Sequence, residues 1–233
     1  MSIARELPVG VLPVSDAEVS TRAGFITRTY SHLLGAILAF AGLEVALFKT
    51  GIADRIIEPM VNAWFLVLGA FMLVGWVASA VAHRIESKVA QYAALLLYVV
   101  AEAIIFLPLL WVADRFAPGV IRAAAVVTGA GFLGLTLVAF WLRKDFSFLG
   151  GLLRFVGICA LVGIGASLFF GFTLGTWFSV AMIAFAGGAI LFNTTMIMRY
   201  YPEDRHVAAS LELFAAVVLM LWYVMRLFLK LRD

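Results

Sequence analysis

The chain has 233 residues, of which 64% are hydrophobic and 13% are charged, with a formal net charge of +3 and a mean hydropathy of +1.07. A water-soluble domain carries about 25% charged residues, so this composition excludes an ordinary soluble fold. The basic residues stand singly or in pairs at the ends of apolar stretches, which argues against a nucleic-acid-binding surface.

Seven apolar runs follow one another along the chain, and a membrane-spanning helix needs about 20 mostly apolar residues. The runs extend from about Phe25 to Phe48, Asn62 to His83, Val89 to Ala113, Val120 to Leu142, Phe148 to Phe172, Trp177 to Met198, and Val207 to Leu229. We therefore predict an all-α, polytopic membrane protein with seven transmembrane helices. Residues 1–22 are predicted to form an N-terminal cytoplasmic arm, and residues 23–230 the transmembrane domain.

The distribution of basic residues predicts the orientation. Ten of them fall on the side of the N-terminal arm and of the loops after the second, fourth and sixth runs, and seven fall on the other side. Basic residues favour the cytoplasmic side of a membrane, so we expect a multi-pass protein of the inner cell membrane with a cytoplasmic N-terminus. The basic C-terminal tail opposes this bias.

Small residues predict where helices touch. Cys159, Gly163, Ser167 and Gly171 recur every four residues along the fifth run. Helices in lipid associate through close backbone approach, which small residues permit. We expect this stripe to be a helix contact.

Ionisable and amide side chains inside the apolar runs are the candidates for function, because each is costly in lipid unless it is paired or hydrated. They are Glu44, Glu102, Arg154, Asn193 and Glu212. Asn193 and Glu212 lie at similar distances from the turn between the last two runs, so they are expected at one depth and could face each other. Two plainer interpretations remain open: Glu212 as a residue reaching out from a helix end, and Asn193 as a packing hydrogen bond.

Several chemistries lack support in the sequence. Every lysine lies at a helix end, so no mid-membrane amine is available for a Schiff base. No zinc-protease, serine-hydrolase or nucleotide-binding motif is present. We expect no enzymatic activity and no cofactor, and we assign no metal ligands.

The chain resembles the Bax inhibitor, or transmembrane BAX inhibitor motif, family of seven-helix proteins. The motifs that carry the resemblance are Arg28-x-Tyr30, Thr128-x-x-x-Phe132, the loop Arg143-Lys144-Asp145-Phe146-Ser147, Gly150-Gly151, and Ser210-Leu211-Glu212-Leu213-Phe214. The resemblance implies six helices wrapped around a central C-terminal helix. It also implies a relation to calcium-permeable leak channels that are gated by pH.

The family's pH sensor is a pair of aspartates, one in the sixth helix and one in the seventh. In this chain the corresponding positions are Asn193 and Ala216, and neither can titrate. Calcium prefers about six to eight oxygen ligands and usually more than one carboxylate. The chain is therefore identified as a bacterial-type member of the family that lacks the di-aspartate pair and has a weakened pH and calcium sensor.

Two functions follow from this resemblance. The first is a leak channel or transporter for a cation such as calcium, with Glu212, Asn193, Glu102 and Arg154 along its path. The second is a non-conducting modulator that binds other membrane proteins, such as a membrane-anchored ATP-dependent protease. Three intramembrane glutamates favour the first function, whereas the missing aspartate pair favours the second.

Overall fold

The structure is a computed structural model that describes residues 14–16, 18–85, 87–142 and 144–232. Its elements are η1 (Val14–Asp16), α1 (Val19–Lys49), α2 (Ile52–Asn62), α3 (Trp64–Arg84), α4 (Lys88–Phe116), α5 (Val120–Leu142), α6 (Leu149–Phe170), α7 (Thr176–Arg199) and α8 (His206–Lys230). Seven of the eight described α-helices, all but α2, are long and apolar enough to cross a membrane. The prediction of an all-α protein with seven membrane-spanning helices is confirmed.

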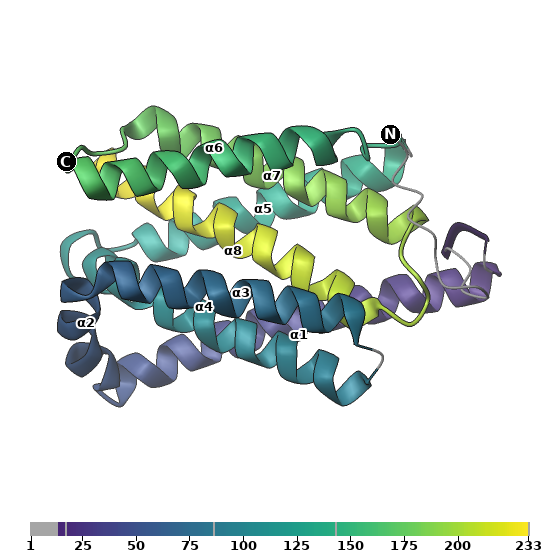
Figure 1. Ribbon diagram of the computed structural model, residues 1–233, viewed down its shortest axis with the longest axis horizontal. Coiled ribbons are helices and arrows are strands. Elements are labelled where there is room, and N and C mark those ends of the chain that lie inside the picture. The colour runs from purple at the N-terminus through teal and green to yellow at the C-terminus, as the bar shows by residue number, and fades with distance from the viewer. Residues whose placement is uncertain (1–13, 17, 86, 143, 233) are drawn as a thin grey trace.

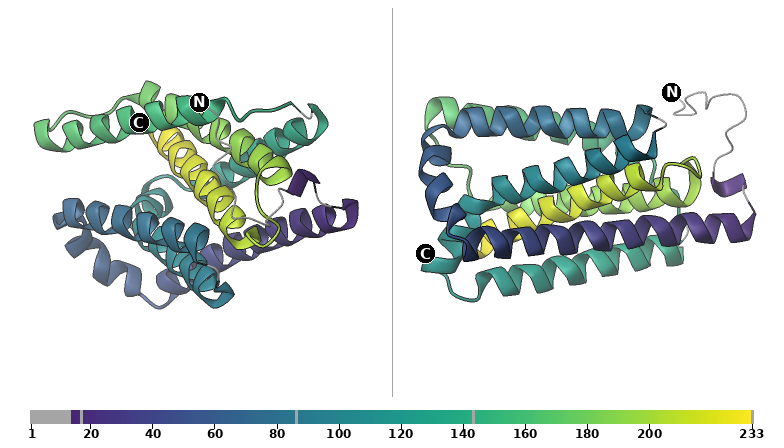
Figure 2. Two further views of the ribbon diagram at one scale, coloured as in Figure 1. Left: turned by 45° about the vertical axis from the view of Figure 1, so that its right-hand side comes forward. Right: turned by 90° about the horizontal axis from the view of Figure 1, so that it is seen from below.

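Helix α8 lies at the centre of the bundle. It packs against α1, α3, α4, α5 and α7, and 72% of its most apolar window is buried. In Figure 1 it runs diagonally between α6 on one side and α3 on the other, and the left view of Figure 2 shows the same arrangement. The central position that the resemblance implied for the C-terminal helix is confirmed.

Helix α2 is an element that the sequence analysis did not predict. Gly51 adopts a left-handed backbone conformation (φ 71°) that ends α1 and turns the chain back. Ala53 and Met60 of α2 are buried against Leu107 of α4, with Ile56 and Ile57 beside them, whereas its charged side chains are exposed. This spacing of apolar residues is that of an amphipathic surface helix, and 11 residues are too few to span a bilayer.

The first membrane-spanning helix begins earlier than expected. Helix α1 starts at Val19, inside the stretch predicted to be the N-terminal arm. Residues 1–13 and 17 of that arm lie outside the described residues. In η1, the backbone N–H of Val14 donates a hydrogen bond to the carbonyl of Tyr201 (3.0 Å), and Val14 is buried. This contact joins η1 to the loop between α7 and α8.

Helix α6 lies at the outside of the bundle, where it packs against α7. The contact does not use the predicted stripe of small residues: Cys159 is exposed, and a Cβ added to Gly163 would meet nothing within 4 Å. Instead, a Cβ at Gly150 would lie 2.9 Å from the ring of Phe192. The stripe prediction was wrong within this chain, because α6 turns a different face to its neighbour.

Candidate functional site

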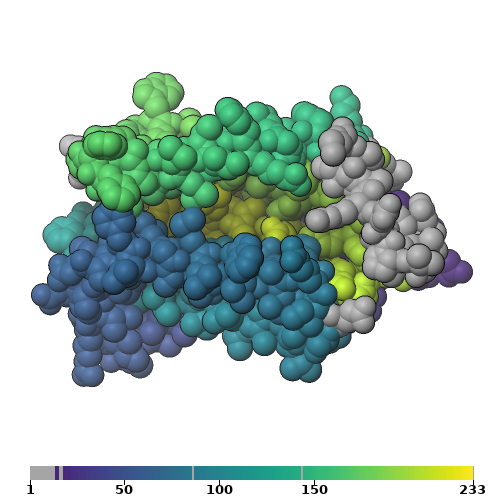
Figure 3. All heavy atoms as spheres, in the orientation of Figure 1, coloured from purple at the N-terminus to yellow at the C-terminus, as the bar shows by residue number. Residues whose placement is uncertain are grey.

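A cavity of about 590 Å³ lies along α8, between α3 and α4 on one side and α6 and α7 on the other. We call it the α8 cavity. Its polar and charged lining residues are Tyr98, Glu102, Ser167, Asn193, Glu212, Tyr223 and Arg226. The rest of the lining is apolar. Figure 3 shows the hollow between the blue α3 and the green α6, with the yellow α8 at its base. The central position of α8 thus brings intramembrane polar residues from several helices to one space.

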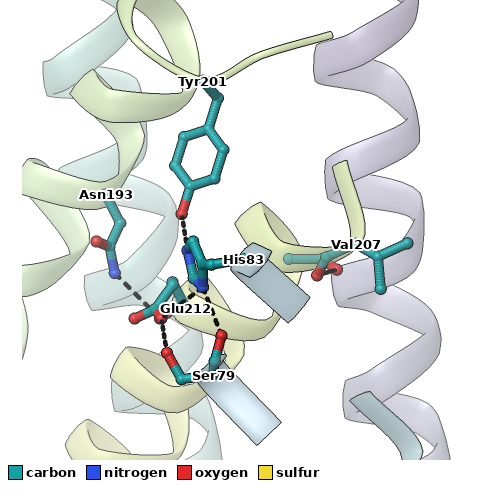
Figure 4. A network of polar contacts seen from close by, with 7 residues as sticks. Ser79, His83, Asn193, Tyr201, Val207 and Glu212 are labelled. Carbon is teal, nitrogen blue, oxygen red and sulfur yellow. Dashed lines mark hydrogen bonds and ion pairs between the residues drawn. The ribbon is translucent and has the colours of Figure 1, made fainter. Parts of the chain in front are cut away.

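Glu212 is the centre of a polar network at one end of this cavity (Figure 4). The hydroxyl of Ser79 donates a hydrogen bond to Glu212 Oε1 (3.1 Å), and Nδ1 of His83 lies 3.9 Å from the same oxygen. Ser79 and His83 are one turn apart on α3, so one face of that helix supplies both groups. The network therefore links α3 to α8.

Asn193 reaches Glu212 in a different way from the one that the sequence suggested. Its side-chain Nδ2 donates a hydrogen bond to the backbone carbonyl of Glu212 (3.0 Å). The two residues lie at the same level and line the same cavity. The amide thus connects α7 to the α8 backbone and leaves the Glu212 carboxylate to Ser79 and His83.

Tyr201 closes the network from the loop after α7. Nδ1 of His83 lies 2.9 Å from the Ser79 carbonyl, which can only accept, so Nδ1 carries the proton in this contact. In a neutral imidazole, Nε2 then accepts the proton of the Tyr201 hydroxyl, 3.1 Å away. Burial and the negative charge of Glu212 raise the pKa of Tyr201 well above its ordinary value, so the hydroxyl keeps the proton that it donates.

The other candidate residues divide between the cavity and its surroundings. Glu102 lines the cavity from α4 with 5% of its surface exposed, and Ala216 lines it from α8, one turn after Glu212. Glu44 is buried in α1, away from the cavity lining, and its carboxylate oxygens have no hydrogen-bond partner among the described residues. Arg154 is exposed on α6 and does not line the cavity.

The loop of the family motif lies between α5 and α6. Asp145 accepts hydrogen bonds from the Tyr200 hydroxyl (2.6 Å) and from the backbone N–H of Ser147 (2.9 Å). Partial burial raises the pKa of Asp145, but these bonds and the charge of Arg199 outweigh it, and the net pKa lies below the ordinary value. Lys144 is exposed, and Arg143 lies outside the described residues. Asp145 thus joins the start of α6 to the end of α7.

Sequence reasoning missed Ser79, His83 and Tyr201. A histidine at a helix end and a tyrosine in a polar loop are ordinary in a membrane protein, and small hydroxyl residues are common in membrane helices. The four-residue spacing of Ser79 and His83 was the signal that could have drawn attention to one face of α3. Their partner on α8 could not be identified from spacing alone, since it depends on how the helices pack.

Among the described residues, no group of three or more histidine, cysteine, aspartate or glutamate side chains could hold a metal ion. The α8 cavity brings together two carboxyl groups, one amide and one guanidinium instead. Such a set has fewer carboxylates than a tight calcium site needs.

The sequence matches the family model described as "Inhibitor of apoptosis-promoting Bax1" over residues 22–233. It is also similar to the protein named Bax inhibitor 1 of Schizosaccharomyces pombe. The two are 30% identical over 209 residues, which cover 87% of this chain and 74% of the yeast protein.

Proposed function

This chain belongs to the Bax inhibitor family of membrane proteins, and we propose that it is a cation leak channel or transporter with a weakened pH and calcium sensor. The observation that carries the proposal is that Glu102 and Glu212 line one cavity beside the central helix. An acidic residue inside a membrane is costly and usually marks an ion or proton pathway. Two of them at one space favour a path for a cation.

The weakened sensor rests on Asn193 and Ala216, the two positions where the family pattern has aspartates. Both residues line the α8 cavity. Two neighbouring carboxyl groups that share a proton titrate in two separated steps and can switch near neutral pH. An amide and a methyl group cannot do so. The calcium flux of this protein is therefore expected to be low and to respond weakly to pH.

The test is calcium flux into liposomes that hold the purified chain. Asn193→Asp combined with Ala216→Asp restores two carboxyl groups to the cavity and should raise a pH-dependent flux above that of the wild type. Glu102→Gln and Glu212→Gln should each lower the residual cation flux. The matched control is Glu44→Gln, which removes a buried carboxyl group outside the cavity lining and should leave the flux unchanged. Equal flux in the wild type and the double aspartate variant would contradict the proposed sensor.

The proposed location is the inner cell membrane, with a cytoplasmic N-terminus. Arg84, Lys88, Lys144 and Arg205 belong to the end of the bundle that holds η1 and Tyr201, which supports this orientation through the cytoplasmic preference of basic residues. Reporter fusions at the two termini test it: only the reporter that reaches the outside should show the activity of an exported enzyme.

A second candidate function is modulation of another membrane protein, such as a membrane-anchored ATP-dependent protease. It is favoured by the outlying position of α6, where Phe155, Ile158 and Val162 are exposed and leave an apolar face free for a partner helix. Crosslinking in cells separates the two functions. A stoichiometric protease partner, together with no cation flux, would favour the modulator and contradict the channel.

A further inference from the structure

The α8 cavity is open sideways, toward the surroundings of the bundle. Helices α3 and α6 do not pack against each other along their lengths, and Figure 3 shows α8 at the bottom of the gap between them. Both helices are long and apolar enough to span the membrane, so the mouth of the cavity faces lipid chains. At one end the exposed rings of Phe65 and Phe169 meet across the mouth, with centroids 5.6 Å apart.

The two ends of the cavity differ in chemistry. Asn193 and Glu212 lie at the end that carries the Tyr201 network. Toward the other end the lining is mainly apolar and aromatic, with Trp64, Leu168 and Trp222, and it finishes at Arg226. A ligand that fits along this half has an apolar body and an anionic group at the Arg226 end.

Arg226 lies near the end of α8, and its charge acts on Tyr223 of the same helix. It makes no hydrogen bond or ion pair with any residue that the structure describes. Its neighbours along the chain are engaged: Lys230 donates to the carbonyl of Leu174 (2.6 Å), and Arg232 donates to that of Pro118 (2.9 Å). A guanidinium beside apolar surface needs an anion, and its planar fork matches the oxygens of a phosphate.

We propose that the α8 cavity binds one anionic phospholipid, with its phosphate on Arg226 and an acyl chain lying along α8 between α3 and α6. The lengths agree. From Arg226 to Ala216 the helix rises by about 15 Å, which is roughly the depth of one leaflet of hydrocarbon. The acyl chain would thus end at Ala216, about one helical turn short of Glu212, and would leave the polar network around Glu212 uncovered. Phe65 and Phe169 would close over it from the mouth.

An anionic headgroup suits this end of the bundle better than a zwitterionic one. Lys230 and Arg232 add positive charge near Arg226, and a choline headgroup would bring a further cation there. Binding of a lipid at this site does not depend on whether the cavity conducts ions. A loss of lipid binding would therefore leave the channel proposal standing, and an absence of ion flux would leave lipid binding standing.

Native mass spectrometry of the delipidated full chain in detergent tests the proposal, with phosphatidylglycerol and phosphatidylcholine of identical chains as ligands. We expect one tightly held phosphatidylglycerol per chain and weaker binding of phosphatidylcholine. Arg226→Gln should weaken the phosphatidylglycerol complex about tenfold, the loss expected for one charge-assisted bond. The matched control is Arg122→Gln, which removes an exposed basic residue outside the cavity lining and should bind as the wild type does.

Leu219→Trp tests where the acyl chain binds, because Leu219 lines the cavity and the larger tryptophan ring would fill the space proposed for the acyl chain. This variant should lose the lipid while keeping its size-exclusion profile and helical circular dichroism. Glycerol phosphate, which has the headgroup chemistry without chains, should not compete. Competition by glycerol phosphate, equal binding of both lipids, or wild-type binding by Arg226→Gln would overturn the proposal. A delipidated dimer that phosphatidylglycerol fails to separate would also overturn it, since a second copy would then fill the mouth.

Discussion

Helices α6 and α8 have the same mean hydropathy, 2.1 over their most apolar windows, yet 6% of that window is buried in α6 and 72% in α8. In water, such a difference in burial would go with a difference in composition. In lipid it need not, because hydrocarbon is as apolar as leucine and exerts no hydrophobic force between helices. Packing, small residues and hydrogen bonds decide which helix is central.

The first prediction compares a leucine on each helix. Leu213 of α8 is fully buried, whereas Leu161 of α6 is 50% exposed. Leu213→Ala should lower the free energy of unfolding by about 2–5 kcal/mol, because it leaves a cavity among packed neighbours. Leu161→Ala removes mainly lipid contacts and should change it little. Unfolding in mixed detergent micelles measures both variants, and similar losses for the two would show that α6 is packed as tightly as α8.

The second prediction compares two polar side chains. Asn193 donates across a helix interface to the Glu212 carbonyl, whereas Ser167 of α6 donates within its own helix, to Ile164. Asn193→Ala should cost about 1 kcal/mol of stability, in the range measured for hydrogen bonds between membrane helices. Ser167→Ala should cost less, because it links no second helix. The same unfolding assay in mixed micelles measures both variants. A greater loss of stability in Ser167→Ala than in Asn193→Ala would contradict the role of Asn193 in joining two helices.

The third prediction concerns the polar contact at the start of α6 and has the smallest expected effect, because Asp145 is mostly exposed to solvent. Burial alone would raise the pKa of Asp145, but the Tyr200 hydroxyl, the Ser147 bonds and the charge of Arg199 together outweigh it and hold the pKa below the ordinary 3.8. A lowered folded-state pKa contributes stability above the unfolded-state value, and this contribution is lost as the pH falls through the folded value. Wild-type stability should therefore fall below about pH 4 relative to Asp145→Asn.

Stability curves of the two proteins between pH 7 and pH 3 measure this difference. Tyr200→Phe serves as the matched partner, since it removes the other side of the same hydrogen bond. The stability curve of Tyr200→Phe should therefore differ less from that of Asp145→Asn than the wild-type curve does. Parallel curves for the wild type and Asp145→Asn would show that the loop contact contributes nothing.

Much of the fold could be predicted from the chain, since seven long apolar runs leave few alternatives in a bilayer. Helix α2 was not predicted because Asp54, Arg55 and Glu58 interrupt its apolar residues. Its mean hydropathy is therefore that of a loop, although its apolar residues have the spacing of an amphipathic helix. Glu102, Asn193 and Glu212 were found through their cost in lipid. Ser79, His83 and Tyr201 carry no such cost at their positions and were missed.

The sequence by itself determined the class of the protein, the number of spanning helices and the level at which Asn193 and Glu212 meet. These follow from hydropathy and from the constant rise of a helix, which are local properties. Only the tertiary structure decided that Asn193 bonds to a backbone carbonyl, that Arg154 faces outward, and that Glu102 and Arg226 share one cavity. These facts depend on how each helix is rotated and which neighbours it meets, and an almost uniformly apolar helix carries little information about its rotation.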